Sequence, residues 1–304
     1  MPATNVETLT NPRDSLPNVY TNVTAREIDF VSRFSRNWDA LREVLGIMRP
    51  VKKQNGTKLV SYTASVTLED GDVDPGNVIP YSKATVVQSA MTDLTIQKYA
   101  KAVPIEDVIN YGAEIAIQKT DDAFLTELQS NVMDDFYSTL TTVVSGTTIT
   151  GTYETFQKAI SMAIGKVRAK FKTMHKTITN VAVFVNVEDA YEYLGEAALT
   201  IQTAFGIDYL KNFLGANILI LTTEVEAGKV VATPVENLVL YYIDPSDSDF
   251  AKLGLNYAVD GETNLIGFHA NGNYSTAVGE SFALQGMKLW PEYADGIAVM
   301  TIGT

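Results

Sequence analysis

Hydrophobic and polar residues alternate most regularly in residues 58–68, KLVSYTASVTL, where positions 60, 62, 64, 66 and 68 are apolar and Ser or Thr fills the positions between. Strict period two is typical of a β-strand. A second segment, 83–102, returns with Leu94 and Ile96 between polar residues. We therefore predict a long two-stranded hairpin over residues 58–102. An isolated hairpin is barely stable in water, so this one should rest on another chain or another part of its own.

A helical period precedes the hairpin. Thr24 and Glu27 have the spacing of a capping box, and Gly46 supplies the stop. The apolar stripe between them consists of Ile28, Val31, Phe34, Trp38, Leu41 and Leu45. Four arginines lie largely off this stripe, namely Arg26, Arg33, Arg36 and Arg42. They indicate either a solvated side or a contact with enclosed nucleic acid.

The helical period returns after Pro104. One long helix over residues 113–140 is predicted by the apolar side Ile117, Phe124, Leu128, Val132 and Phe136. The sequence TDD at 120–122 could instead cap a second helix. Beyond it, Thr152 is predicted to open another helix, with a core face of Phe156, Ile160, Ala163, Ile164, Val167 and Phe171. Its far half is basic, which indicates a solvated face or a nucleic-acid contact: Lys158, Lys166, Arg168, Lys170 and Lys172.

The last part of the chain mixes strands and a helix. VAVFVNVEDAYEYLG predicts a buried strand at 181–185, a cap at Asn186 with Asp189 three residues later, and a short helix. Further strands are predicted at 217–222 and 237–243, and IDPSDSD reads as a turn. FALQGMKLWPEYADGIAVMTI predicts two strand-like runs joined by PEYADG. Residues 1–24 have no period, which indicates a disordered tail or an arm that becomes ordered on a neighbouring subunit.

The amino-acid composition excludes several classes of function. The 304 residues carry 23 Lys and Arg against 36 Asp and Glu, a net charge of −13, which argues against a protein that grips nucleic acid in a basic groove. A shell that only encloses nucleic acid needs no such groove. With no cysteine, the chain has no disulfide, thiolate metal site or cysteine nucleophile. We see no signal peptide and no apolar run of about 20 residues that could cross a membrane, so we expect a soluble cytoplasmic product.

Catalytic motifs are missing from the sequence. The two histidines, His175 and His269, are far apart and read as a solvated residue and a loop residue. We find no GxSxG, phosphate loop or GxGxxG motif, and a pair of carboxylates that meet only in space stays open. We therefore predict that the protein is not an enzyme and has no catalytic, cofactor-binding or metal site.

The acidic segment LEDGDVDPGNVIP, residues 68–80, is the one candidate for a metal site. Counted from Asp70, Asp72 and Asp74 fit the first ligands of an EF-hand calcium loop. Pro75 then stands where the loop needs Gly, and Tyr81 where it needs Glu. Half of the motif is missing, so we interpret these acids, with Glu69, as the tip of the protruding hairpin.

The order of arm 1–24, hairpin 58–102 and helix 113–140 resembles that of the major capsid proteins of tailed bacteriophages, the Hong Kong ninety-seven-like family. VAVFVNVEDAYEYLG resembles that family's first strand, polar cap and short helix of the axial domain, and MKLWPEYADGIAVMTI resembles its closing strands. The resemblance covers nearly the whole chain and rests on order and pattern, because the family has no specific motif.

The resemblance implies an α+β fold of six parts. These are an N-terminal arm (1–26), an N-terminal helix and lead-in (27–57), an extended β-hairpin loop (58–102), a peripheral domain with a spine helix (103–150), an axial domain (151–280) and closing strands that return to the peripheral domain (281–304). Since no helical scaffolding segment of the family's kind precedes the arm, a separate scaffolding protein, or none, is implied. Some relatives join subunits covalently through Lys and Asn, but Lys83 on the hairpin is too weak a signal to predict that crosslink.

The function that the resemblance implies is a structural head protein. It would assemble as hexamers and pentamers into an icosahedral shell around double-stranded DNA, with a portal and non-specific DNA contacts. It would be assembled in the bacterial cytoplasm, found in the virion and without a membrane partner. One alternative is an encapsulin-like compartment, which shares the fold and encloses protein cargo. Another is a secreted calcium- or carbohydrate-binding surface protein, which the absent signal peptide disfavours.

Overall fold

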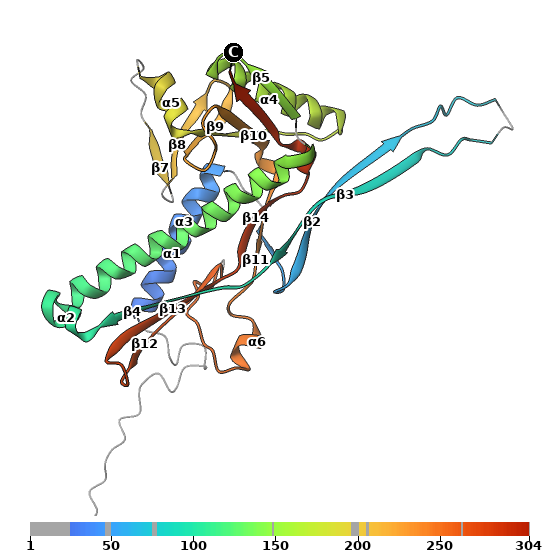
Figure 1. The fold of residues 1–304 in the computed structure, drawn as a ribbon. Helices are drawn as coiled ribbons and strands as arrows, with labels where there is room; N and C mark the ends of the chain where they lie inside the picture. The colour runs from blue at the N-terminus through green and yellow to red at the C-terminus, as the bar shows by residue number, and fades with distance from the viewer. Residues whose placement is uncertain are drawn as a thin grey trace, which may run out of the picture.

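The computed structural model describes residues 25–45, 50–74, 78–147, 149–195, 201–204, 207–262 and 264–303 (Figure 1). The helices in these ranges are α1 (Ala25–Leu45), α2 (Ile105–Tyr111), α3 (Ala113–Thr147), α4 (Phe156–Thr173), α5 (Val187–Leu194) and α6 (Ser248–Ala251). The strands are β1 (Pro50–Lys52), β2 (Thr57–Thr67), β3 (Lys83–Leu94), β4 (Gln97–Pro104), β5 (Ile149–Tyr153), β6 (Val181–Asn186), β7 (Gln202–Ala204), β8 (Ile207–Phe213), β9 (Ala216–Thr222), β10 (Lys229–Pro234), β11 (Leu238–Tyr242), β12 (Ile266–Asn273), β13 (Val278–Gln285), β14 (Met287–Pro291) and β15 (Ala298–Ile302). The predicted α+β class is confirmed.

Helix α3 is the long axis of the molecule and runs diagonally across it in Figure 1. It is one continuous helix of 35 residues, so TDD does not begin a second helix. The break lies earlier, at Gly112, whose φ of 85° separates α2 from α3 and suits a residue without a Cβ. Leu128 and Phe136, two residues of the predicted apolar side, are fully buried. The single long helix predicted from the sequence is confirmed.

A seven-stranded sheet forms the upper part of the molecule in Figure 1, in the order β5-β15-β10-β6-β9-β8-β7. Its strand β6 is buried on both faces, because the apolar residues of α4 pack against one face and the end of α3 packs against the other. The Phe136 ring of α3 meets the Phe184 ring of β6 edge to face at 5.6 Å. Burial on two faces explains why β6 reads as an unbroken apolar run.

The start of α4 differs from the prediction. Thr155, and not Thr152, is the N-cap, since its hydroxyl accepts a hydrogen bond from the Lys158 N–H at 3.3 Å. Residues before it form strand β5, which pairs in parallel with β15 at the far end of the chain. A pairing partner some 150 positions away leaves no local pattern, so β5 is missed by periodicity. The predicted core face of α4 is buried throughout.

Helix α1 packs beside α3 and on strand β12 in the lower part of the molecule. Phe30, Val31, Phe34 and Trp38 are buried, whereas Ile28 is 51 % exposed, so the prediction of Ile28 as a core residue is wrong. The buried stripe is rotated because the carboxylate of Glu27 turns inward, toward β12. Thr24, Gly46 and the side chains of Leu41 and Leu45 lie outside what the structure describes.

Two small sheets complete this part, β12-β13-β4 and β1-β11-β14. β4 pairs antiparallel with β13 and does not pair with β2. The prediction of one hairpin over 58–102 is therefore wrong in its last part, and the hairpin consists of β2 and β3 alone. The chain leaves the hairpin at Leu94, which is buried, and Ile96 N–H is held by the Asn55 side chain at 3.0 Å. This anchor redirects the chain into the second sheet.

The end of the chain is divided between sheets. β14 pairs with β11 alongside α3, whereas β15 lies inside the seven-stranded sheet between β10 and β5. The return of residues 281–304 to the peripheral domain stays a prediction. Ala298 and Met300 of β15 are fully buried against the α4 side of the sheet, which fixes its place there. The other domain boundaries stay predictions.

Candidate functional site

Among the described residues, the hairpin β2–β3 extends farthest from the body (Figure 1). It is fastened at its base, where Leu59 and Leu94 are buried and the Ser61 hydroxyl donates to the Pro291 carbonyl at 2.6 Å. Beyond Ser61 the pairing shifts by one residue, a bulge that strengthens the twist of the ribbon. The base is therefore part of the core, and the outer half has to find its contacts elsewhere.

The outer half of the hairpin exposes apolar side chains. Val66 is 62 % exposed and Val86 is 69 % exposed. Val66 pairs with Ala84, and Val86 pairs with position 64, so these four positions share one face of the ribbon. The opposite face carries Thr67 paired with Lys83, but also Val87, which is 60 % exposed. The face with Val66 and Val86 is thus apolar and uncovered in the single subunit.

The acidic segment lies at the tip of this hairpin, as predicted. Glu69, Asp70, Asp72 and Asp74 are all exposed, and the Asp72 N–H donates to the Asp70 carboxylate at 3.0 Å, which forms an Asx turn. Residues 75–77 lie outside the described ranges. Among the described residues, those of the tip included, no three His, Asp or Glu side chains are grouped as ligands for a metal ion.

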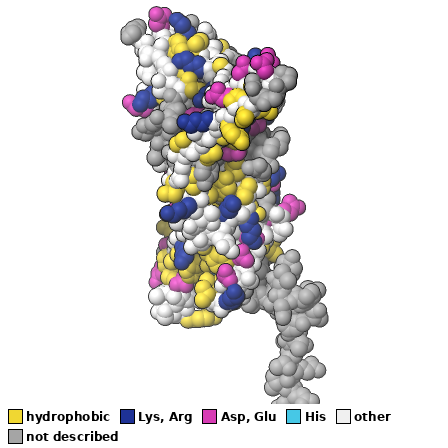
Figure 2. Space-filling model, turned by 90° about the vertical axis from the view of Figure 1, so that its right-hand side faces the viewer, with side chains coloured by type: hydrophobic (Ala, Val, Ile, Leu, Met, Phe, Trp, Pro, Cys, Tyr) yellow, Lys and Arg dark blue, Asp and Glu magenta, His cyan; other side chains and the backbone are white. Residues whose placement is uncertain are grey.

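Figure 2 views the molecule from the side toward which the hairpin projects. Hydrophobic side chains reach the surface at several heights on this face, and charged side chains of both signs separate them. No helix in the described ranges is long and apolar enough to cross a membrane.

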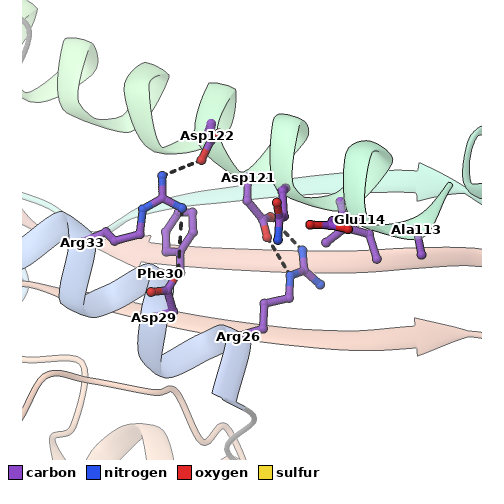
Figure 3. A pocket seen from close by; sticks show the side chains of 10 residues that line it. Arg26, Asp29, Phe30, Arg33, Ala113, Glu114, Asp121 and Asp122 are labelled. Atoms are coloured by element: carbon purple, nitrogen blue, oxygen red, sulfur yellow. Dashed lines mark hydrogen bonds and ion pairs between the residues drawn. The ribbon is translucent and has the colours of Figure 1, made fainter. Parts of the chain in front are cut away.

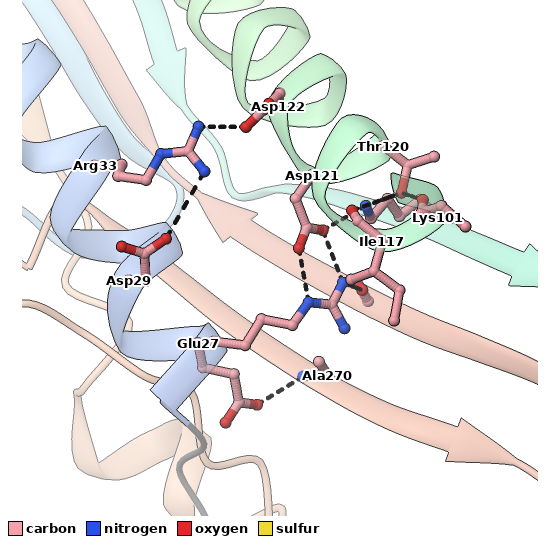
Figure 4. Close-up of polar contacts among 12 residues, drawn as sticks. Glu27, Asp29, Arg33, Lys101, Ile117, Thr120, Asp121, Asp122 and Ala270 are labelled. Carbon is pink, nitrogen blue, oxygen red and sulfur yellow. Dashed lines mark hydrogen bonds and ion pairs between the residues drawn. The ribbon is translucent and has the colours of Figure 1, made fainter. Parts of the chain in front are cut away.

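A cluster of charged contacts joins α1 to the first half of α3 (Figure 4). Arg26 binds the Asp121 carboxylate through two hydrogen bonds of 2.7 Å and also donates to the Ser281 hydroxyl at 3.0 Å. Lys101 of β4 forms a second ion pair with Asp121. One carboxylate thus joins a helix, a strand and a second helix.

The protein environment favours the charged form of Asp121 and disfavours the charged form of Lys101. Burial alone would raise the pKa of the Asp121 carboxyl, but hydrogen bonds from Arg26 and Lys101 outweigh it, so this pKa lies below its ordinary value. Burial lowers the pKa of Lys101, and its pairing with Asp121 offsets this only in part. Asp121 faces two cations, whereas Lys101 shares its anion with Arg26. Removing the carboxylate would therefore leave two cations facing each other.

A cavity of about 600 Å³ opens beside this cluster between α1 and α3 (Figure 3). Its walls include Arg26, Phe30, Arg33 and Asp121. Arg33 forms ion pairs with Asp122 and, at 3.8 Å, with Asp29. Most of the charged groups at the wall bind one another, so the arrangement holds two helices together.

Two of the four arginines and one of the two histidines are placed differently from the prediction. Arg26 and Arg33 bridge α1 and α3, and are not a solvated side. His269 lies in strand β12, not in a loop, with its Nδ1 3.0 Å from the Glu27 carboxylate. Glu27 also accepts from the Ala270 N–H at 2.7 Å. His175 is exposed at the end of α4, as predicted.

Sequence reasoning missed the role of Asp121 and Asp122. They appeared only as part of a possible helix cap, because their partners lie 95 and 89 positions away. The available signal was the pair of arginines seven residues apart on the same side of α1, opposite two neighbouring acids. Charge complementarity of this kind becomes visible only when the two helices are known to be neighbours.

Comparison with known proteins supports the fold and goes no further. No protein-family model matches the chain, and no curated protein matches it in sequence. The capsid structure of cyanophage P-SCSP1u is 8 % identical, with a TM-score of 0.50 over 86 % of this chain and 88 % of that one. The mature capsid protein of bacteriophage PhiM1 is 9 % identical, with a TM-score of 0.49 over 85 % of this chain and 86 % of that one. A virus-like particle from Pyrococcus furiosus is 11 % identical, with a TM-score of 0.49 over 91 % of this chain and 100 % of that one. Because these two TM-scores are below 0.5, the assignment of the fold rests on the cyanophage structure. The chain has the Hong Kong ninety-seven-like fold predicted from its sequence.

Proposed function

We propose that the protein is a non-enzymatic major capsid protein that assembles into the icosahedral shell of a tailed bacteriophage. One observation carries the proposal: a long hairpin is anchored in the core at its base, while its outer half exposes an apolar face. A ribbon of this kind is marginal alone, and an uncovered apolar face marks a protein interface. The hairpin is therefore built to lie on a neighbouring subunit.

Assembly follows from the asymmetry of this contact. A hairpin that projects from one side and docks on a different surface of the next copy makes a head-to-tail contact, which generates a ring when the rotation between copies closes and a filament when it does not. In the proposed shell these rings are hexamers and pentamers around enclosed double-stranded DNA. Each contact is modest, but many contacts per subunit make the shell stable through multivalency. A separate scaffolding protein and a portal are proposed partners, the virion is the proposed location, and assembly in the host cytoplasm belongs to the same proposal.

The test is negative-stain electron microscopy and light scattering of the purified protein, expressed alone and with the scaffolding protein of its source. We expect rings or closed shells. A matched control removes residues 65–85 and joins positions 64 and 86 by an Asn–Gly turn, which keeps the anchored base and suits a two-residue hairpin. This variant should fold and remain unassembled. A stable monomer for the intact chain under all these conditions would contradict the proposal.

The encapsulin-like alternative predicts the same shells with a different content. Particles isolated from the natural source separate the two. DNA-filled heads with tails support the phage capsid, and tailless particles filled with a protein cargo support the compartment.

A further inference from the structure

We propose that the far end of α4 and the turn after it form a binding surface for the phosphate backbone of the enclosed DNA, with Arg168, Lys172 and Lys176 as its contacts. We call these three residues the basic corner. The inference rests on the proposed function, since it assigns a surface of the subunit to the molecule that the shell would enclose.

The sequence concentrates positive charge here against the trend of the whole chain. The protein has 36 acidic residues and a net charge of −13, yet residues 155–187 contain no Asp or Glu and six Lys or Arg. A protein that is acidic overall is repelled by DNA, so only a local surface of the opposite sign can approach it. Residues 155–187 provide such a surface.

The structure shows which of these six cations are already engaged. Lys166 donates to the Thr150 carbonyl at 2.8 Å, Lys170 binds Asp295 at 2.9 Å, and Lys158 lies 3.8 Å from Glu154. Lys166 and Lys170 are held by these contacts within the subunit, whereas Lys158 is exposed but lies in the first turn of α4, away from the far end of the helix. The contacts of Lys166 and Lys170 stabilise the fold around α4 and engage these two cations.

The basic corner is different. Its three side chains are exposed, and none of them has a carboxylate partner among the described residues. Arg168 reaches the Thr179 carbonyl at 3.5 Å, and the Lys176 ammonium lies 3.4 Å from the centre of the Tyr293 ring, which orients it without neutralising it. The nearby carboxylate of Glu236 is occupied by the N–H groups of Thr179 and Asn180 at 2.7 and 3.2 Å.

The spacing suits a row of phosphates. Arg168 and Lys172 are four residues apart on the outer side of α4, and one helical turn separates them by about 6 Å along the axis. The helix then ends at Thr173, with Met174 as its C-cap, and the left-handed conformation of His175 turns the chain and places Lys176 beyond the last turn. Three cations on one corner bind phosphates without reading base sequence, which is what a shell around a whole genome needs.

The experiment measures binding of fluorescently labelled double-stranded DNA to unassembled subunits by anisotropy at several salt concentrations. Three phosphate contacts predict a log–log slope near −2.7, so binding should weaken about 40-fold between 50 and 200 mM salt. The variant R168Q/K172Q/K176Q should bind at least about tenfold more weakly at the lower salt, with a slope near zero. The control K98Q/K119Q/K211Q changes three other exposed lysines and the net charge equally, and should bind like the wild type.

Equal loss of binding in both variants would overturn the proposal, because overall charge and not the basic corner would then govern binding. Shell assembly without DNA is measured in parallel, and both variants should assemble. If only the R168Q/K172Q/K176Q variant fails to assemble, the corner contacts a neighbouring subunit, such as its acidic hairpin tip, and the proposal is wrong. If the wild type forms no shells but shows the predicted DNA binding and salt slope, the proposed DNA-binding surface is supported and the proposed capsid function is contradicted.

Discussion

Asp121 and Asp122 are neighbours on one turn of α3, and the structure gives them different tasks. The Asp121 side chain is 8 % exposed and bound to two cations, while that of Asp122 is 49 % exposed and bound to Arg33. Hydrogen bonds to buried charged groups contribute more than exposed ion pairs, which are weakened by water and salt. The two residues form a matched pair for measuring what the α1–α3 junction contributes.

We expect Asp121→Asn to lower the free energy of unfolding by about 2 kcal/mol and Asp122→Asn by less than about 1 kcal/mol. Because the pKa of Asp121 is lowered on folding, its contribution is complete above the ordinary aspartate value of about 3.9 and is lost as the pH falls through the lower folded-state value. Urea unfolding of subunits between pH 3 and 7 checks this, with the hairpin-trimmed variant as background if shells form. Equal effects of the two substitutions would contradict the assigned roles.

Substitution of two glycines gives a second matched pair, which measures how tightly α4 is packed. A Cβ on Gly296 would lie 2.5 Å from the Phe171 ring, whereas a Cβ on Gly165 meets nothing within 4 Å. We expect Gly296→Ala to cost about 1–3 kcal/mol through overpacking. Gly165→Ala should stabilise the exposed face of the helix by up to about 1 kcal/mol. Thermal melts of the two variants should move in opposite directions, and an unchanged melt for Gly296→Ala would show that the Phe171 ring yields.

At the scale of elements, the base of the hairpin contributes to folding of the subunit, whereas its outer half is available for assembly. Its base belongs to the core, but its tip and apolar face touch nothing in the described part of the subunit that would bury them. Substitutions in the outer half should therefore leave the subunit stable and affect only the contacts between subunits. This separation makes the acidic tip a clean test.

We expect the quadruple variant E69Q/D70N/D72N/D74N to leave the thermal melt of the subunit unchanged, because exposed charges contribute only about 0–1 kcal/mol each. Any loss should appear in assembled shells. Melts are recorded with calcium and with a chelator, since a metal that binds only the folded state raises its stability by mass action. A fall caused by the chelator in the wild-type subunit, absent from the variant, would show that the segment is a calcium loop after all.

At the scale of the whole molecule, residues 1–24 are the remaining candidate for a contact between copies. They lie outside the described residues, and the two described core clusters begin at Phe30 and Phe156. We expect deletion of residues 1–20 to leave the subunit melt nearly unchanged and to reduce the yield or stability of shells. Light scattering and electron microscopy of the deleted and intact proteins check this. Equal assembly of both would mean that the segment is an inert tail.

The sequence by itself determined those features that depend only on residues close together in the chain. The period of two in β2, the buried faces of α3 and α4, and the Asn186 cap, whose side chain accepts from the Glu188 N–H at 2.8 Å, all follow from local geometry. The order of these elements was enough to predict the fold. The acidic tip also followed, because a charged segment between two strands cannot be buried.

Tertiary structure alone decided how distant segments pair. It assigned β4 to β13 and not to β2, placed β5 beside β15, and turned Arg26 and Arg33 of α1 from solvent to the acids of α3. Each of these contacts joins residues about 90 or more positions apart. Local patterns record which side of an element is apolar, but several partners satisfy the same pattern. The choice among them is made by the packing of the whole core, which no single segment contains.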